Sequence, residues 1–201
     1  MLAVTVSLAA CGDDGDDDDG GTAGGDRRPA EGAAADASLE VSVTELDAGV
    51  RIAWTVTNDG DEPLLVFDNL RGDEAEGEPV QGAYVTGGEG GTVEVSRRLF
   101  PVPDDVEGVQ DYAVTAAGLA PGASKAATDS VGLPFAYGPA APEGGGDALP
   151  DAPSRAVFCV GVAPVEAIET ARPLAPGRWS VPHSEENAAR QTVLCGDPFD
   201  V

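Results

Sequence analysis

The chain has 201 residues with 11 basic and 36 acidic side chains, a formal net charge of −25. This length suits one folded domain with or without a tail, and 42% apolar residues can form a core. The charge argues against nucleic-acid binding, because each phosphate contact requires a cation that this surface lacks. One His and one Met exclude most transition-metal sites built from those ligands. The 27 glycines and 16 prolines favour turns over long helices.

Residues 1–10 read MLAVTVSLAA, an uncharged apolar run that ends at Cys11. A membrane-spanning helix needs about 20 residues, so this run is too short to cross a bilayer. Its length fits the apolar region of a secretory signal peptide. The tetrapeptide LAAC at residues 8–11 resembles the lipobox of bacterial lipoproteins. This resemblance implies cleavage before Cys11, a thioether-linked diacylglycerol on its sulfur, and an extracytoplasmic protein anchored to the cell membrane by that lipid.

The leader departs from the usual pattern in one respect. Secretory signals carry a basic region, yet no Lys or Arg precedes Arg27. We therefore expect the signal to begin upstream of Met1. The alternative is an apolar N-terminus that contains LAAC by chance.

Residues 11–37 predict a disordered acidic tether. Six aspartates fall within residues 13–19, and Gly, Ala and Pro follow without an aromatic or large aliphatic side chain. Such a segment cannot bury enough surface to offset its ordering entropy. The aspartates lack the glycine and the closing glutamate of an EF-hand calcium loop, which favours a solvated tether over a cation site.

The clearest strand signals lie in residues 38–70. Apolar and polar residues alternate in residues 39–43 and again in residues 50–57, as half-buried strands require. Turns are expected at residues 47–49 and 58–61, and the apolar run 64–68 predicts a buried strand. Three short strands joined by tight turns indicate an antiparallel sheet.

The rest of the chain continues this rhythm with one expected helix. The tetrapeptide LAPG occurs at residues 119–122 and 174–177 and predicts a turn before a strand each time. Apolar spacing favours a short helix at residues 164–172, and residues 137–153 predict a long surface loop. Further strands are expected at residues 82–86, 91–100, 112–116, 125–133, 155–162, 178–181 and 191–195.

Residues 38–70 together with the first LAPG turn resemble the immunoglobulin-like modules common in bacterial envelope proteins. The resemblance covers residues 38–133 and carries no catalytic residue with it. We predict a mostly β protein, an antiparallel immunoglobulin-like β-sandwich over residues 38–201. At most one or two short helices belong to it, and a disordered tail precedes it.

Two cysteines remain in the predicted domain. If Cys11 carries lipid, Cys159 and Cys195 form an even pair in an oxidising compartment, which favours a disulfide. The disulfide would connect the strand at residues 155–162 to the closing strand at residues 191–195. The alternative is a reactive thiol, since two Cys and one His cannot complete a zinc site.

No pattern of catalytic residues stands out. His183 lies beside a proline and before a polar cluster, which favours an exposed loop position over a role in a triad, and no Gly-x-Ser-x-Gly elbow occurs. Carboxylate pairs such as Glu185 and Glu186 are expected in so acidic a chain. No phosphate-binding or dinucleotide loop is present. We predict no catalytic, cofactor-binding or metal-ligating residues and no cofactor.

One stretch is both basic and apolar. Arg97, Arg98, Leu99 and Phe100 precede two prolines and form a candidate recognition loop. The alternative is the end of a strand, with Leu99 and Phe100 in the core.

The function that follows is a membrane-anchored envelope lipoprotein whose domain binds a protein or envelope ligand without catalysis. The alternatives are a hydrolase acting on envelope glycans through paired carboxylates, and an inhibitor or structural module. The expected partners are the membrane, through the lipid on Cys11, and an unknown protein or ligand. The sequence leaves the oligomeric state open.

Overall fold

The structure, a computed structural model, describes residues 34–70, 82–102, 113–135 and 146–201. Cys11, the predicted signal peptide and most of the predicted tether lie outside these residues. The described part is mostly β, with twelve strands and one α-helix. Within it, no helix is long and apolar enough to cross a membrane.

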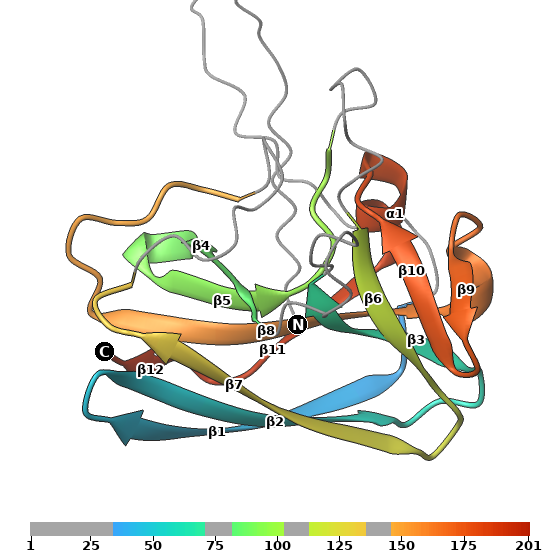
Figure 1. The fold of residues 1–201 in the computed structure, drawn as a ribbon, viewed down its shortest axis with the longest axis horizontal. Helices are drawn as coiled ribbons and strands as arrows, with labels where there is room; N and C mark the ends of the chain where they lie inside the picture. The colour runs from blue at the N-terminus through green and yellow to red at the C-terminus, as the bar shows by residue number, and fades with distance from the viewer. Residues whose placement is uncertain (1–33, 71–81, 103–112, 136–145) are drawn as a thin grey trace, which may run out of the picture.

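The strands form two sheets (Figure 1). Sheet A is antiparallel in the order β1 (Ala37–Leu46), β2 (Gly49–Asn58), β7 (Ser124–Gly132). Sheet B has the order β4 (Tyr84–Gly87), β5 (Val93–Arg97), β8 (Arg155–Pro164), β3 (Leu64–Leu70), β6 (Ala113–Leu119), β10 (Arg178–Pro182), β9 (Arg172–Ala175). β11 (Thr192–Cys195) and β12 (Phe199–Asp200) also pair with β8.

Strand β8 is the centre of sheet B. Its Val160 pairs with Arg97 of β5 in parallel and with Leu194 of β11 in antiparallel orientation, so β8 is hydrogen-bonded along both edges. From β8 the sheet curls into a half-barrel, and sheet A covers one of its faces (Figure 1).

A first core fills the space between the two sheets. The inward residues of β2 are fully or almost fully buried because the strand alternates between apolar and polar side chains. The cluster joins Val50, Ile52, Trp54 and Val56 to Val93, Val95, Phe158, Val160 and Val162 of sheet B. Each such side chain contributes roughly 1.5–3 kcal/mol when it leaves water, so this core holds sheet A in place.

A second core lies on the opposite face of sheet B. Strand β3 serves both cores, because Val66 faces the first cluster while Leu65 and Phe67 belong to the second. This double burial explains the continuous apolar run of β3. A 3-10 helix at Val165–Ala167 and the helix α1 (Glu185–Arg190) cover the second core.

The prediction of a mostly β protein is confirmed, and strands occur in all the expected regions. The immunoglobulin-like arrangement of those strands is not confirmed, since sheet B curls into a half-barrel. The two LAPG turns have the expected geometry. Gly122 and Gly177 adopt φ values of +70° and +71°, which glycine tolerates and which the third position of a type II turn requires.

The predicted helix at residues 164–172 is wrong. Only the 3-10 turn forms there, and the chain then continues into β9, which pairs with β10 across the second LAPG turn. The helix that does form, α1, was not predicted from the sequence. Ser184 caps it by accepting a hydrogen bond from the backbone N–H of Asn187, and Glu185 and Arg190 suit its two ends.

The predicted loop at residues 137–153 lies partly outside the described residues. In its described portion Asp147 makes an isolated bridge with Gly87, which attaches the loop to the end of β4.

Candidate functional site

A buried ionic cluster joins the two sheets along β7. The carboxylate of Asp129 accepts hydrogen bonds from Trp54 Nε1 and Arg97 Nε, both at 2.9 Å. Arg97 also pairs with the second Asp129 oxygen and donates to the backbone oxygen of Asp68. These side chains are nearly inaccessible, so β2 and β7 of sheet A are fixed to β3 and β5 of sheet B by charge as well as packing.

The cluster continues at the carboxylate of Asp68. Its Oδ2 contacts Lys125 Nζ at 2.8 Å and also pairs with Arg178. Arg178 in turn donates to Thr115 Oγ1 at 2.9 Å. Both buried carboxylates therefore pair with cations of the fold itself, Asp129 through both oxygens and Asp68 through Oδ2. The other oxygen of Asp68, Oδ1, is buried without a hydrogen-bond partner among the described residues. Charged residues at inward positions of strands were the sequence signal for this cluster, and the sequence analysis missed it.

His183 is buried, with 1% of its surface exposed, so the expectation of an exposed loop residue is wrong. Its Nδ1 accepts a hydrogen bond from the Phe100 backbone N–H at 3.0 Å. Nε2 therefore carries the proton and donates to the Tyr84 hydroxyl at 2.9 Å. Burial, assisted by the charge of Arg98, lowers the pKa of His183 to about 4. Burial also raises the pKa of Tyr84. The neutral ring is a structural clamp with both nitrogens engaged.

The candidate recognition loop lies largely inside the protein. Arg97 is buried in the ionic cluster, and Leu99 and Phe100 are fully buried in the second core. Arg98 is half-buried, with Nε 2.6 Å from Glu94 Oε1 and its guanidinium 4.4 Å from the Phe100 ring centre. These residues therefore form the end of a strand with Leu99 and Phe100 in the core, which was the alternative interpretation of the sequence. They present no exposed loop to a partner.

Cys159 and Cys195 are direct partners across β8 and β11. Their Cα atoms lie 4.1 Å apart and their sulfur atoms are at disulfide distance, as predicted. Among the described residues no group of three or more His, Cys, Asp or Glu is arranged to hold a metal ion.

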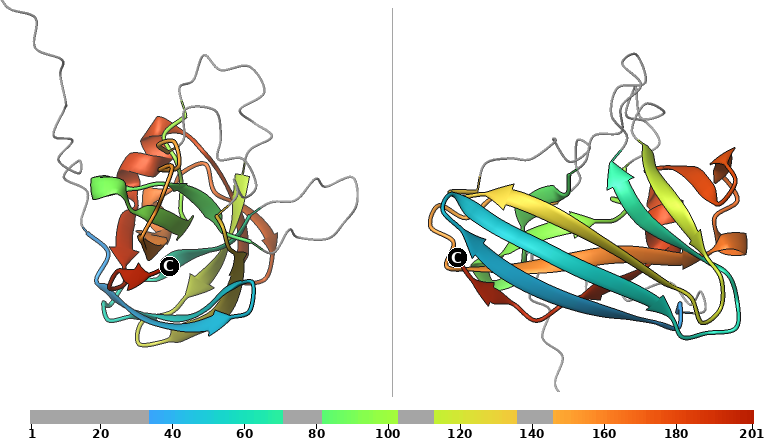
Figure 2. Two further views of the ribbon diagram at one scale, coloured as in Figure 1. Left: turned by 90° about the vertical axis from the view of Figure 1, so that its left-hand side faces the viewer. Right: turned by 60° about the horizontal axis from the view of Figure 1, so that its bottom comes forward.

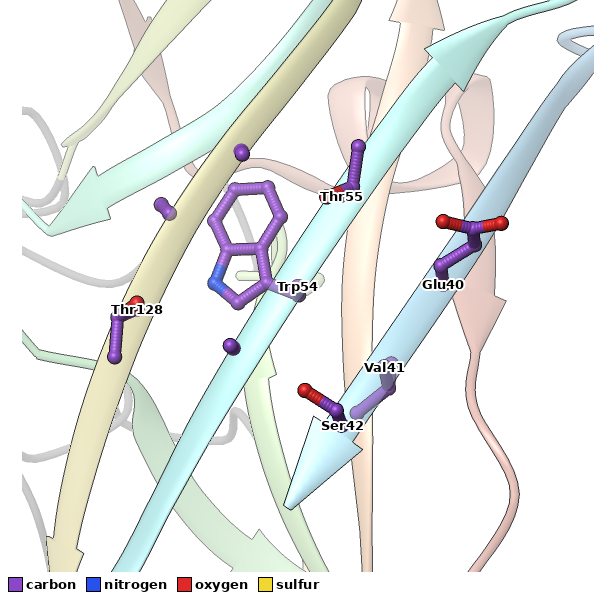
Figure 3. Close-up of a pocket in the computed structure, with 9 residues that line it drawn as sticks. Glu40, Val41, Ser42, Trp54, Thr55 and Thr128 are labelled. Atoms are coloured by element: carbon purple, nitrogen blue, oxygen red, sulfur yellow. The ribbon is translucent and has the colours of Figure 1, made fainter. Parts of the chain in front are cut away.

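The outer face of sheet A carries a shallow hollow of about 550 Å³. Outward positions of the three strands are mainly Ser, Thr and Ala, because the large side chains of the alternating pattern point to the core. Figure 3 shows Glu40 and Ser42 of β1, Thr55 of β2 and Thr128 of β7 around the hollow. Ala53 lies between Ser42 and Thr128 in register, and this small side chain deepens the centre.

A second hollow, the β1 groove, lies between β1 and the segment of residues 195–199. Its volume is about 570 Å³. The half-buried side chains of Leu39, Val41 and Val43 form one wall. Gly196 packs directly on Val41, since a Cβ at residue 196 would lie only 2.7 Å from Val41 Cγ2. Figure 2 shows β1 at the margin of sheet A beside the red C-terminal strands.

The two hollows meet at Glu40 and Val41, which line both. Strand β1 is thus approachable from the outer face and from its edge. The opposite margin of sheet A, strand β7, is tied to sheet B by Lys125 and Asp129. The accessible site of the described domain is therefore strand β1 with its flanking hollows. Sequence alternation identified β1 as a strand, but its position at a sheet margin depends on long-range pairing.

No family model matches this chain, and neither a curated protein nor a solved structure matches it.

Proposed function

We propose that this protein is a membrane-anchored lipoprotein of the cell envelope whose β domain binds a partner without catalysing a reaction. The LAAC tetrapeptide at residues 8–11 and the aspartate-rich segment behind it support an anchor and a tether. The disulfide between Cys159 and Cys195 supports an oxidising compartment.

The observation that carries the binding function is the distribution of polar groups in the described domain. The buried groups able to perform acid–base chemistry, Asp68, Asp129 and His183, hold the fold together. The open surface lies at β1, where small hydroxyl and apolar side chains line two hollows. A hollow with such a lining can contact a ligand, whereas proton transfer needs a positioned acid and base.

The alternatives have less support. A glycan hydrolase needs two carboxyl groups facing each other across a cleft. The carboxylates of the β1 groove are Glu40 and Asp197, and both are exposed to solvent. For the fold, an immunoglobulin-like pairing of sheets remains a proposal, supported by the packing of β2 against β5 and β8.

The test is crosslinking of the lipidated protein in intact cells, followed by identification of the captured molecule. We expect one specific partner, lost with Cys11→Ser because the unanchored chain leaves the membrane. Ser42→Arg, in the outer hollow, is expected to reduce capture. Asp151→Arg, exposed and distant in sequence from β1, serves as the control and makes the larger change in net charge. Capture at background level by the anchored protein would refute the binding function.

A further inference from the structure

Strand β1 is a long edge strand without proline, lysine or a bulge. Among the described residues it pairs only with β2, through ten consecutive partners without a register shift. At about 3.4 Å per residue the strand is roughly 34 Å long, and near its middle Gly196 packs on the core-facing side chain of Val41. Edge strands are normally protected by proline, lysine, bulges or short length, because unpaired N–H and C=O groups attract other strands. The sequence of β1, ASLEVSVTEL, contains no proline or lysine, and its charged residues are Glu40 and Glu45. These glutamates discourage pairing with an acidic strand but not with a basic one.

Most other edge strands of the described part are short or contain proline, and β11 has only four residues. β9 has Arg172 and Pro173 within its four residues, and β12 has two residues. β4 is four residues long and its end pairs with Asp147. Among the described residues β7 also pairs only with β2, but it carries Lys125, and Lys125 and Asp129 join it to sheet B. β1 has neither lysine nor proline and lies beside a groove, so it is the edge better suited to pairing.

The β1 groove gives an added strand a place for its side chains. On an additional strand, alternate residues would point toward the groove and contact Leu39, Val41 and Val43, which are only half-buried now. The residues between them would lie beside Glu40, Ser42 and Thr44 on the outer face. An alternating apolar and polar segment therefore fits this edge.

Charge determines which segment fits best. Acidic residues flank β1 throughout, namely Asp36, Glu40, Glu45, Asp47 and Asp197. The positive charges of sheet A are Arg51 and Lys125, and Lys125 is bound to Asp68. Opposite charges on neighbouring strands stabilise pairing, and like charges oppose it. A second copy of this acidic chain is thus repelled, whereas a basic segment is attracted.

We propose that the free edge of β1 binds an extended segment of a partner polypeptide, in which basic and apolar residues alternate, as a fourth strand of sheet A. The inference rests on the proposed binding function and specifies how the partner attaches. Main-chain hydrogen bonds to β1 supply affinity, the groove selects apolar side chains, and Glu40 on the outer face selects basic ones. Glu45, at the end of the strand, adds negative charge to this edge.

The test uses the full chain with Cys11→Ser and an acetylated, amidated octapeptide of alternating Lys and Val. Amide hydrogen exchange is measured residue by residue with and without the peptide. In the free protein, alternate amides of β1 face the open edge and exchange fast. We expect the peptide to protect these amides selectively, and the matched peptide of alternating Glu and Val to leave them unprotected.

Charge reversal at the edge provides the matched variants. Glu40→Lys with Glu45→Lys is expected to weaken binding of the Lys–Val peptide by about tenfold. Glu166→Lys with Glu169→Lys changes the net charge equally at exposed positions beside the second core, and binding should stay close to that of the unmodified chain. An equal loss of peptide affinity in both variants would mean that net charge alone determines binding, and it would overturn the proposal.

Two outcomes would assign the edge to another occupant and overturn the inference. Protection of β1 amides that rises with protein concentration alone would indicate a second copy. Displacement of the peptide by myristate would indicate an acyl chain in the β1 groove. If the anchored protein captures a partner in cells and Glu40→Lys with Glu45→Lys captures it equally, the binding function stands and strand addition fails. If β1 amides are protected but no partner is captured, the strand-binding edge stands and the cellular binding function fails.

Discussion

Asp129 supplies the carboxylate that neutralises Arg97 between the two sheets, and both side chains are almost inaccessible to water. Asp129→Asn keeps the shape but removes the charge, which leaves a buried guanidinium without its carboxylate. We expect the free energy of unfolding to fall by about 3–5 kcal/mol, measured by urea denaturation. Asp151→Asn, an exposed position, should change it by less than about 0.5 kcal/mol. Equal effects of the two substitutions would contradict the role of the cluster.

His183 makes stability depend on pH. Its pKa is lowered from 6.5 to about 4 in the folded protein, so the unfolded chain binds the proton more tightly. The contribution of the neutral His183 ring to the free energy of unfolding is complete above pH 6.5 and is lost as pH falls toward 4. It amounts to about 3 kcal/mol, at roughly 1.4 kcal/mol for each pH unit.

The measurement is direct because the chain has one His. Its imidazole proton signals in NMR should titrate near pH 4 in the folded state. In urea denaturation, His183→Gln should lower stability at pH 7, and the difference from the unmodified chain should shrink between pH 6.5 and 4. An imidazole that titrates near 6.5 in the folded protein would show that the ring is not the buried clamp described above.

At the scale of the element, the disulfide fixes β11 to the central strand β8. It closes a loop with a sequence separation of 36 residues, for which chain entropy gives about 3–4 kcal/mol. Cys159→Ala with Cys195→Ala, in a chain that also carries Cys11→Ser, should lose that much in urea denaturation. Dithiothreitol should destabilise the parent chain to a similar extent and leave the double variant unaffected. If dithiothreitol also destabilised the double variant, its effect on the parent chain could not be assigned to this disulfide.

The sequence predicts elements well where the cause is local. Alternation identified β1 and β2, and two glycines identified the two LAPG turns. The predictions failed where contacts with residues far away in the sequence determine the local structure. The segment around Ile168 has helical spacing, yet that side chain is buried in the second core and the chain turns into β9. His183 looked exposed because its partners, Tyr84 and Phe100, are more than 80 residues away.

The candidate site also depends on contacts between residues that are far apart in the sequence. Glu40 and Val41 stand in an ordinary alternating strand, and only long-range pairing makes that strand an edge. The Ser184 cap of α1 was a local signal in the sequence from which no helix was predicted.

At the scale of the whole molecule, a net charge of −25 opposes compaction through self-repulsion. Salt weakens this repulsion, because the screening length falls from about 10 Å at 0.1 M to about 3 Å at 1 M. The buried pair of Arg97 and Asp129 is screened much less. We therefore expect the free energy of unfolding to rise as NaCl increases from low to high concentration.

The matched variant separates repulsion from a general effect of salt. Glu166→Lys with Glu169→Lys makes the net charge less negative at exposed positions and should reduce the salt dependence while raising stability at low salt. Urea denaturation of both chains across a NaCl series measures this. A stability that falls with salt would mean that surface ion pairs outweigh self-repulsion. In that case the acidic surface would stabilise the folded state, and its charge would not support a basic partner at β1.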